Sequence, residues 1–116
     1  MTVHKFRSLA LDLPEVTENE HMGHPDFRVG GKIFATLWPN DAWGMVKLTP
    51  DQQAAFVSSA PEIFQPVSGG WGRGGATRVS LRHARTLPVR QALVTAWRNT
   101  APKKLVQRYD EESHAD

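Results

Sequence analysis

Hydrophobic residues near the start of the chain recur at helical spacing. Residues three or four positions apart lie on one face of a helix. Four apolar residues follow this spacing: Val3, Phe6, Leu9 and Leu13. The pattern predicts an amphipathic helix over residues 3–12, which should end before Pro14 because the residue preceding a proline disfavours helical geometry.

The next part of the chain has the pattern of β-strands. Residues 15–22 alternate between apolar and polar positions and predict an edge strand. Residues 26–29 and 32–38 are rich in β-branched and aromatic residues, and two glycines separate them. Because glycine adopts positive φ at little cost, this arrangement predicts a hairpin with a two-residue turn.

A further strand and a second helix follow the hairpin. Residues 42–48 predict a third strand of an antiparallel meander. Thr49 offers a hydroxyl at the N-cap, Pro50 suits the first helical position, and Gln52 stands where a capping box needs its amide. This helix should continue to about Ala60.

The second half of the chain contains shorter elements and a glycine-rich stretch. Residues 61–67 predict a short extended segment, and residues 68–75 contain five glycines and predict a loop. The remaining expectations are a strand over 76–81, a helix over 87–99, a last helical turn or two opened by Ala101-Pro102, and a polar tail over 110–116. The order predicts an α+β domain over residues 1–109, an antiparallel sheet with helices packed on one face.

Composition narrows the class of protein. The chain has 116 residues, 40% of them hydrophobic, which suits one globular domain. It contains no cysteine, which excludes disulfides and thiolate ligands and indicates a reducing compartment. The N-terminus lacks a secretory pattern, and no segment approaches the roughly 20 apolar residues of a membrane span. A cytoplasmic protein without membrane contact is therefore expected.

Charge is distributed unevenly along the chain. The formal net charge is only +2. Residues 12–26, however, carry five acidic residues and no Lys or Arg, whereas residues 71–108 carry nine Lys and Arg and no acidic residue. A basic C-terminal third favours a polyanionic partner.

Motifs for catalysis and cofactor binding are not evident. There is no G-x-S-x-G elbow, and the glycines of residues 69–75 lead into a strand and lack the lysine of a P-loop. Glu20, His21 and His24 have spacing that a small metal site can use, but two histidines near a turn are more often surface residues. No catalytic residue, metal or cofactor is predicted.

The basic residues near the glycine-rich stretch suggest nucleic-acid binding. A loop presenting Trp71 and Arg73, followed by Arg78 and Arg82 on one strand face, can place cations along phosphates while the indole stacks on a base. The first hairpin carries Arg28 and Lys32 near its tip and provides a second wing. The structural alternative is that residues 68–75 only connect two strands and Trp71 packs on the sheet.

Several blocks of the sequence resemble one known family. They are residues 26–35 (DFRVGGKIFA), 46–48 (VKL), 70–79 (GWGRGGATRV), Ala96-Trp97 and 101–105 (APKKL). Together they resemble the MmcQ/YjbR-like proteins over about residues 4–108. The resemblance implies an α-β-β-β-α-β-β-α domain related in shape to frataxin-like and secretion-chaperone-like sandwiches. It also implies bacterial origin and a double-wing DNA-binding arrangement, with no catalytic residues.

Three classes of function remain after this reading. The leading hypothesis is a small, non-enzymatic DNA-binding module that uses the cations named above. The alternative is a protein-interaction or chaperone-like module in which a sheet face or edge meets a partner peptide. A ligand-binding protein or enzyme would require a deep pocket near Trp71, Trp38 or His24. A monomer or weak dimer is expected.

Overall fold

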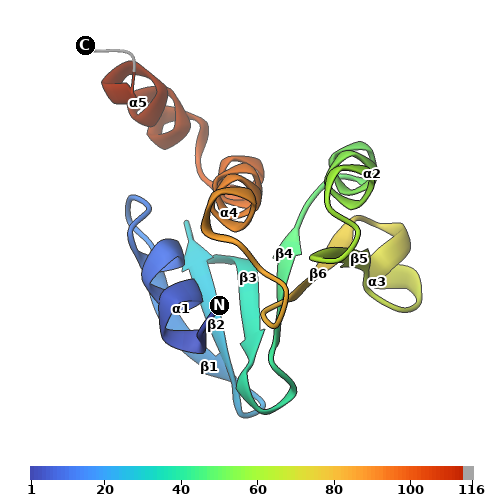
Figure 1. The fold of residues 1–116 in the computed structure, drawn as a ribbon. Coiled ribbons are helices and arrows are strands. Elements are labelled where there is room, and N and C mark those ends of the chain that lie inside the picture. Colours follow the sequence, from blue (N-terminus) through green and yellow to red (C-terminus); the bar gives the residue numbers. More distant parts are fainter. Residues whose placement is uncertain (114–116) are drawn as a thin grey trace.

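The computed structural model describes residues 1–113 as a six-stranded antiparallel sheet with helices packed against it (Figure 1). The strands are β1 (Thr17–His21), β2 (His24–Val29), β3 (Lys32–Trp38), β4 (Trp43–Lys47), β5 (Phe64–Pro66) and β6 (Ala76–Ser80). Their spatial order is β1-β2-β3-β4-β6-β5. The helices are α1 (Val3–Leu11), α2 (Pro50–Ser59), α3 (Gly70–Arg73), α4 (Thr86–Thr100) and α5 (Lys103–Ser113), with a 3-10 turn η1 (Pro39–Asp41) between β3 and β4.

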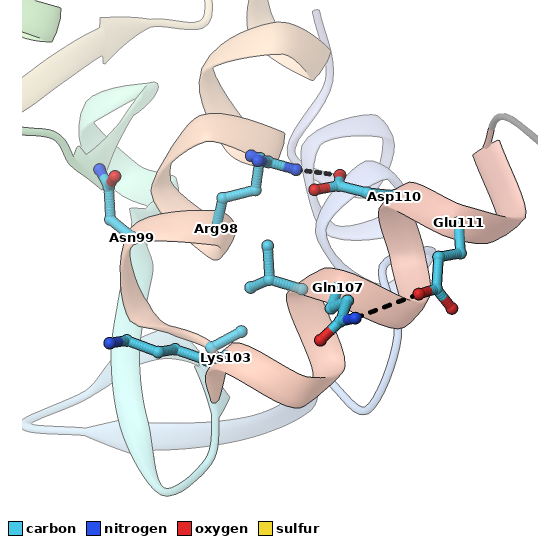
Figure 2. A pocket seen from close by; sticks show the side chains of 8 residues that line it. Arg98, Asn99, Lys103, Gln107, Asp110 and Glu111 are labelled. Carbon is cyan, nitrogen blue, oxygen red and sulfur yellow. Dashed lines mark hydrogen bonds and ion pairs between the residues drawn. The ribbon is translucent and has the colours of Figure 1, made fainter.

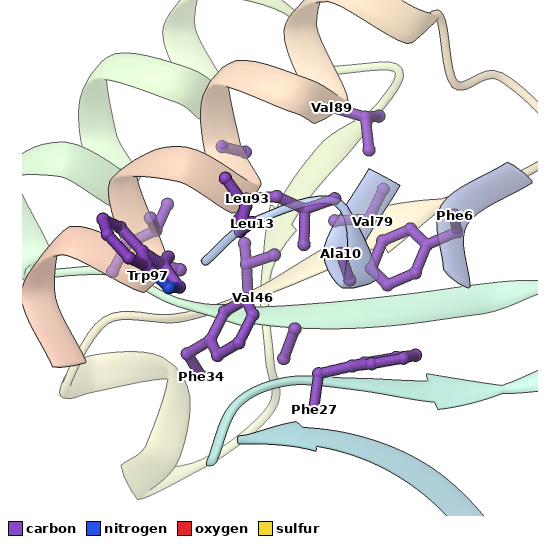
Figure 3. Close-up of a cluster of buried hydrophobic side chains, with 14 of the residues drawn as sticks. Phe6, Ala10, Leu13, Phe27, Phe34, Val46, Val79, Val89, Leu93 and Trp97 are labelled. Atoms are coloured by element: carbon purple, nitrogen blue, oxygen red, sulfur yellow. The ribbon is translucent and has the colours of Figure 1, made fainter. Parts of the chain in front are cut away.

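The core lies between the sheet and the helices on one of its faces. Helix α4 packs across β3 and β4, α1 packs beside α4, and α2 covers β5 and β6. Figure 3 shows Phe6 of α1 and Leu93 of α4 directed toward Phe27 and Phe34 of the sheet. These four side chains and Trp97 are fully buried. The antiparallel sheet and the helices packed on one of its faces confirm the predicted α+β class.

The predicted hairpin and capping box are both present. Val29 pairs with Lys32, and the intervening Gly30 and Gly31 have φ of 60° and 78°. At the start of α2, the Thr49 hydroxyl accepts a hydrogen bond from the Gln52 amide N–H at 3.2 Å, and the Gln52 side chain accepts one from the Thr49 N–H at 2.9 Å. Local sequence signals therefore placed these two features correctly.

The glycine-rich stretch and the C-terminus differ from expectation. Residues 68–75 are not only a loop, because Gly70–Arg73 form the single turn α3. The last helix is longer than one or two turns and continues to Ser113, so residues 110–113 of the expected polar tail are helical. The rest of that tail, residues 114–116, lies outside the described residues. Arg82 was expected on the strand but follows the end of β6, in the turn after it.

Over residues 1–113, one face of the sheet has no covering layer of helices. Side chains alternate between the two faces of a strand, and the core takes Phe27, Ala35, Val46 and Val79. The side chains of Asp26, Thr36, Met45 and Arg78 point to the other side of the sheet, which we call the open face. None of the helices in residues 1–113 is long and apolar enough to cross a membrane.

Candidate ligand-binding face of the sheet

The open face contains a pocket with a volume of about 560 Å³. Its lining comes from β1 to β4, from the start of β6 and from α3. The lining side chains include Asp26, Ile33, Thr36, Met45, Lys47 and Trp71. Trp71 is 73% exposed, so its indole stands at the rim of the pocket and remains available for contact.

A stacked row of side chains crosses the open face, and its first two members, His24 and Trp38, also line this pocket. The rings of His24 and Trp38 have centroids 4.8 Å apart, and Trp38 and Trp43 stack at 4.2 Å with an interplanar angle of 6°. The guanidinium carbon of Arg78 lies 4.9 Å from the Trp43 ring centroid. Because neighbours cover the faces of Trp38 and Trp43, these rings stabilise the sheet surface and leave Trp71 as the exposed aromatic platform.

Close backbone packing holds α3 in place at the end of the sheet. A Cβ on Gly72 would overlap the carbonyl oxygen of Val67, and a Cβ on Gly75 would overlap that of Leu48. Gly75 also has a φ of 113°. The glycines of the 70–75 segment are therefore needed for a close approach of backbones, and this approach presents Trp71 at the rim.

A buried amide completes the attachment of α3. The Nε2 group of Gln53 donates hydrogen bonds of 2.9 Å to the carbonyl oxygens of both Gly72 and Ala76. Gln53 belongs to α2 and is only 9% exposed. The sequence does not reveal this role, because a glutamine inside an amphipathic helix carries no sign that its partners lie 19 and 23 residues further along the chain.

A buried acid lies in the wall of the pocket. The Asp26 side chain is fully buried, and it accepts hydrogen bonds from Arg28 Nε at 2.9 Å and Nη2 at 3.2 Å. This pairing raises the pKa of Arg28. Thr36, the register partner of Asp26 on β3, has a buried hydroxyl oxygen with no hydrogen-bond partner among residues 1–113.

The predicted nucleic-acid residues do not all meet on one surface. Arg28 points to the open face, but the carboxylate of Asp26 occupies its guanidinium. Lys32 pairs with the core residue Val29, which places it on the helix side of the sheet. Arg82 is exposed in the turn that follows β6.

Trp71, Arg73 and Arg78 are the predicted residues that lie at or beside the pocket. A Cβ built on the rim residue Gly70 would lie 3.7 Å from Arg73 Nη2, and Arg78 pairs with the lining residue Met45. Lys47, which the sequence analysis did not select, lines the same pocket. Among the described residues, no carboxylate forms an ion pair with Lys47, Arg73 or Arg78.

The histidines near the β1–β2 turn do not form a metal site with Glu20. His21 pairs with His24 on the open face, whereas Glu20 pairs with Pro25 and its side chain points to the opposite side. Over residues 1–113, no group of three or more His, Asp or Glu side chains is close enough to hold a metal ion.

A second depression lies between α4 and α5, and it has a volume of about 670 Å³. Figure 2 shows that its polar groups largely satisfy one another: Arg98 pairs with Asp110, and Gln107 donates to Glu111 at 3.2 Å. With these groups already engaged, the depression offers less recognition chemistry than the pocket on the open face.

Comparison with known sequences agrees with this fold. The sequence profile of the YjbR family matches residues 11–112, which is most of the chain. The chain belongs to the YjbR family. The matched range includes the Gly70–Gly75 segment that holds Trp71 at the rim, so the resemblance noted on sequence blocks is confirmed. No curated protein matches the sequence.

A solved structure is similar in fold to this YjbR-family chain. It is the crystal structure of Deinococcus radiodurans protein DR2400, described as domain DUF419. The two superpose with a TM-score of 0.74 over 96% of this chain and 86% of that chain, at 16% sequence identity. At this identity the likeness concerns the arrangement of the backbone.

Proposed function

We propose that this protein is a non-enzymatic module that binds single-stranded nucleic acid, with DNA as the first candidate, along the open face and α3. One observation carries the proposal: an exposed tryptophan, Trp71, lies beside cations that form no ion pair within residues 1–113. Proteins that bind single strands combine such aromatic platforms with cations along the backbone path. Here the cations are Lys47, Arg73 and Arg78.

The geometry favours a single strand over a duplex. Stacking on Trp71 requires an unstacked base, which a single strand offers without the cost of opening a duplex. Helix α3 has only four residues, which is too short to read a major groove as a recognition helix does. The double-wing arrangement would need Arg28 and Lys32 as well, and the proposal does not depend on either.

Salt dependence of binding tests the role of the cations. We expect the affinity for a labelled single-stranded oligonucleotide to fall with salt. Each lost phosphate contact should lower the logarithmic slope by about 0.7. Arg73→Gln and Arg78→Gln should each lower the salt slope by this amount in a fluorescence anisotropy titration. Arg90→Gln removes the same charge from an exposed position on α4, across the sheet, and should leave the slope unchanged.

Two results would count against the proposal. One is binding whose affinity does not change with salt. The other is an equal change of the salt slope in Arg73→Gln and Arg90→Gln, which would mean that the oligonucleotide is attracted to the basic protein as a whole and not to this site. A duplex of the same sequence serves as the second probe. Tighter binding to the duplex would contradict the single-strand form of the proposal.

The protein-interaction alternative finds less support at the sheet edges. Strand addition requires an accessible edge with free backbone groups. The outer strand β1 carries Glu18 and Glu20, and the other outer strand, β5, has three residues and ends in Pro66. Charge, short length and proline are features that disfavour edge pairing. Cytoplasmic location and a monomer or weak dimer stay predictions, which fractionation and light scattering can check.

A further inference from the structure

We infer that the pocket on the open face binds a small aromatic carboxylate, that is, a flat ring that carries one carboxyl group. This site goes beyond the proposed function and does not require it. A ligand-binding protein with this sequence needs a pocket near Trp71, Trp38 or His24, and all three residues line this one. The volume of about 560 Å³ is within the range of small-molecule sites, roughly 300–1,000 Å³.

The accessible surface of the pocket suits a flat apolar ring. Ile33 and Trp38 are only partly buried, so their side chains present apolar surface to the cavity. Met45 and Leu48 continue this lining. The Trp71 indole is 73% exposed at the rim, and aromatic rings stack favourably with an offset or edge to face. A ring that enters the pocket therefore exchanges water for apolar side chains and an indole.

One accessible cation sets the charge of the pocket. Lys47 is exposed, and among the described residues it is the only Lys or Arg in the lining. None of the described carboxylates forms an ion pair with it. Asp26, the one acid in the described part of the lining, is fully buried and paired with Arg28, so it does not neutralise Lys47. The pocket therefore attracts a ligand with a negative charge.

The cation and the indole lie at the same end of the sheet. Lys47 pairs with Ala76 in the β4–β6 ladder. Gly75 packs so closely on the next residue of the chain after Lys47 that an added Cβ would overlap the Leu48 carbonyl oxygen. This contact holds the 70–75 segment, and with it Trp71, beside the end of β4 that carries Lys47. A ring stacked on the indole can thus extend its carboxylate toward the ammonium group.

The charge of the lining favours a carboxylate over a phosphate. A phosphate monoester carries about 1.5–2 negative charges at neutral pH. Lys47 supplies one positive charge, which balances a carboxylate and leaves a phosphate undercompensated.

Phenylacetate and its neutral amide, phenylacetamide, test the pocket because they differ in charge but have the same ring and shape. Each is titrated into labelled protein near pH 8, above the usual titration range of histidine, and followed by heteronuclear NMR. The indole N–H signal of Trp71 should shift and saturate. That of Trp97, which is buried and donates to the Pro14 carbonyl, should not move. We expect phenylacetate to bind about two- to fivefold more tightly than the amide.

Variants separate the pocket from general attraction by a basic protein. Lys47→Gln should make the two affinities equal, and Lys47→Arg, which keeps the charge, should preserve the difference. Lys32→Gln removes the same charge from the helix side of the sheet and should leave both affinities unchanged. Ile33→Trp fills the pocket and should abolish binding of both probes, with urea unfolding as the check that the variant folds.

Three results would each overturn the inference. The first is no saturating shift of Trp71 up to about 10 mM phenylacetate, well above the Kd of about 1 mM for a fragment of this size. The second is equal affinity of the parent protein for phenylacetate and phenylacetamide. The third is tighter binding of phenyl phosphate than of phenylacetate. Loss of salt-dependent oligonucleotide binding with intact phenylacetate binding would instead refute the proposed function alone.

Discussion

The attachment of α3 depends on the absence of a side chain at Gly72, and this can be tested by adding one methyl group. In Gly72→Ala the new Cβ would overlap the carbonyl oxygen of Val67 and would lie 3.2 Å from the Val67 nitrogen. Both are backbone atoms, which cannot rotate away as a side chain can. Since φ at Gly72 is not in the positive region, alanine meets no backbone strain there and the effect is steric.

The expected loss of stability depends on the shift of α3 that the new methyl group requires. To relieve the overlap, α3 has to shift away from Val67, which stretches the 2.9 Å hydrogen bond from Gln53 Nε2 to the Gly72 carbonyl. Leaving a buried polar group unpaired costs about 1–3 kcal/mol, and overpacking against backbone atoms adds about 1–3 kcal/mol. The gain of about 0.5–1 kcal/mol from replacing glycine in a helix offsets a part. We expect a net loss of about 2–4 kcal/mol, or roughly 8–16 °C in Tm.

Gly74→Ala is the matched control for this change. Its added Cβ would lie 3.5 Å from the Trp71 carbonyl oxygen, an ordinary contact, and its φ is −81°. We expect it to be neutral or slightly stabilising in urea unfolding followed by circular dichroism. Gly72→Ala should also weaken oligonucleotide binding, because it displaces Trp71. Equal stability of the two variants would refute the account of α3 packing.

Four further changes test other parts of the structure. Gln53→Met leaves the carbonyls of Gly72 and Ala76 without their donor, and urea unfolding should show a loss of about 2–3 kcal/mol. Thr36→Val removes an unpaired buried hydroxyl, so its unfolding midpoint should stay equal or rise; a clear fall would mean that the hydroxyl has a partner. Thr49→Ala removes the N-cap of α2 and should cost about 1 kcal/mol, and no change would contradict the capping box. The pKa of Glu62 is lowered from 4.5 by its own backbone N–H and by Arg85. The stabilisation by the ionised Glu62 carboxylate is therefore fully present above pH 4.5 and is lost as the pH falls through the lowered pKa. The difference in unfolding free energy between the parent and Glu62→Gln should accordingly disappear at acidic pH.

Some features of the site follow from the sequence alone. Asp26 and Arg28 are two positions apart in a strand, so period two already places them on one face, where an ion pair can form. In a hairpin with a two-residue turn at Gly30 and Gly31, residue 29 must pair with residue 32. Lys32 therefore shares the face of Val29, and the separation of Lys32 from Arg28 follows from the same register.

The sequence by itself determined the features that depend on neighbouring residues. The glycine turn of the β2–β3 hairpin, the Thr49 capping box and the alternation of β6 each result from backbone preferences and hydrogen bonds within a few positions. Such preferences act in the same way wherever the segment lies, so they can be read without knowledge of the rest of the chain.

Only the tertiary structure decided the composition of the open face. The sheet places β6 beside β4, which brings Arg78 onto Trp43 and opposite Met45, and Gln53 ties α3 to the same end of the sheet. These contacts join residues that are far apart in the chain, and many pairings of strands satisfy the same local pattern. The choice among them depends on how the whole core packs, because close packing of Phe6, Phe27, Val46 and Trp97 is achieved in one arrangement of the elements.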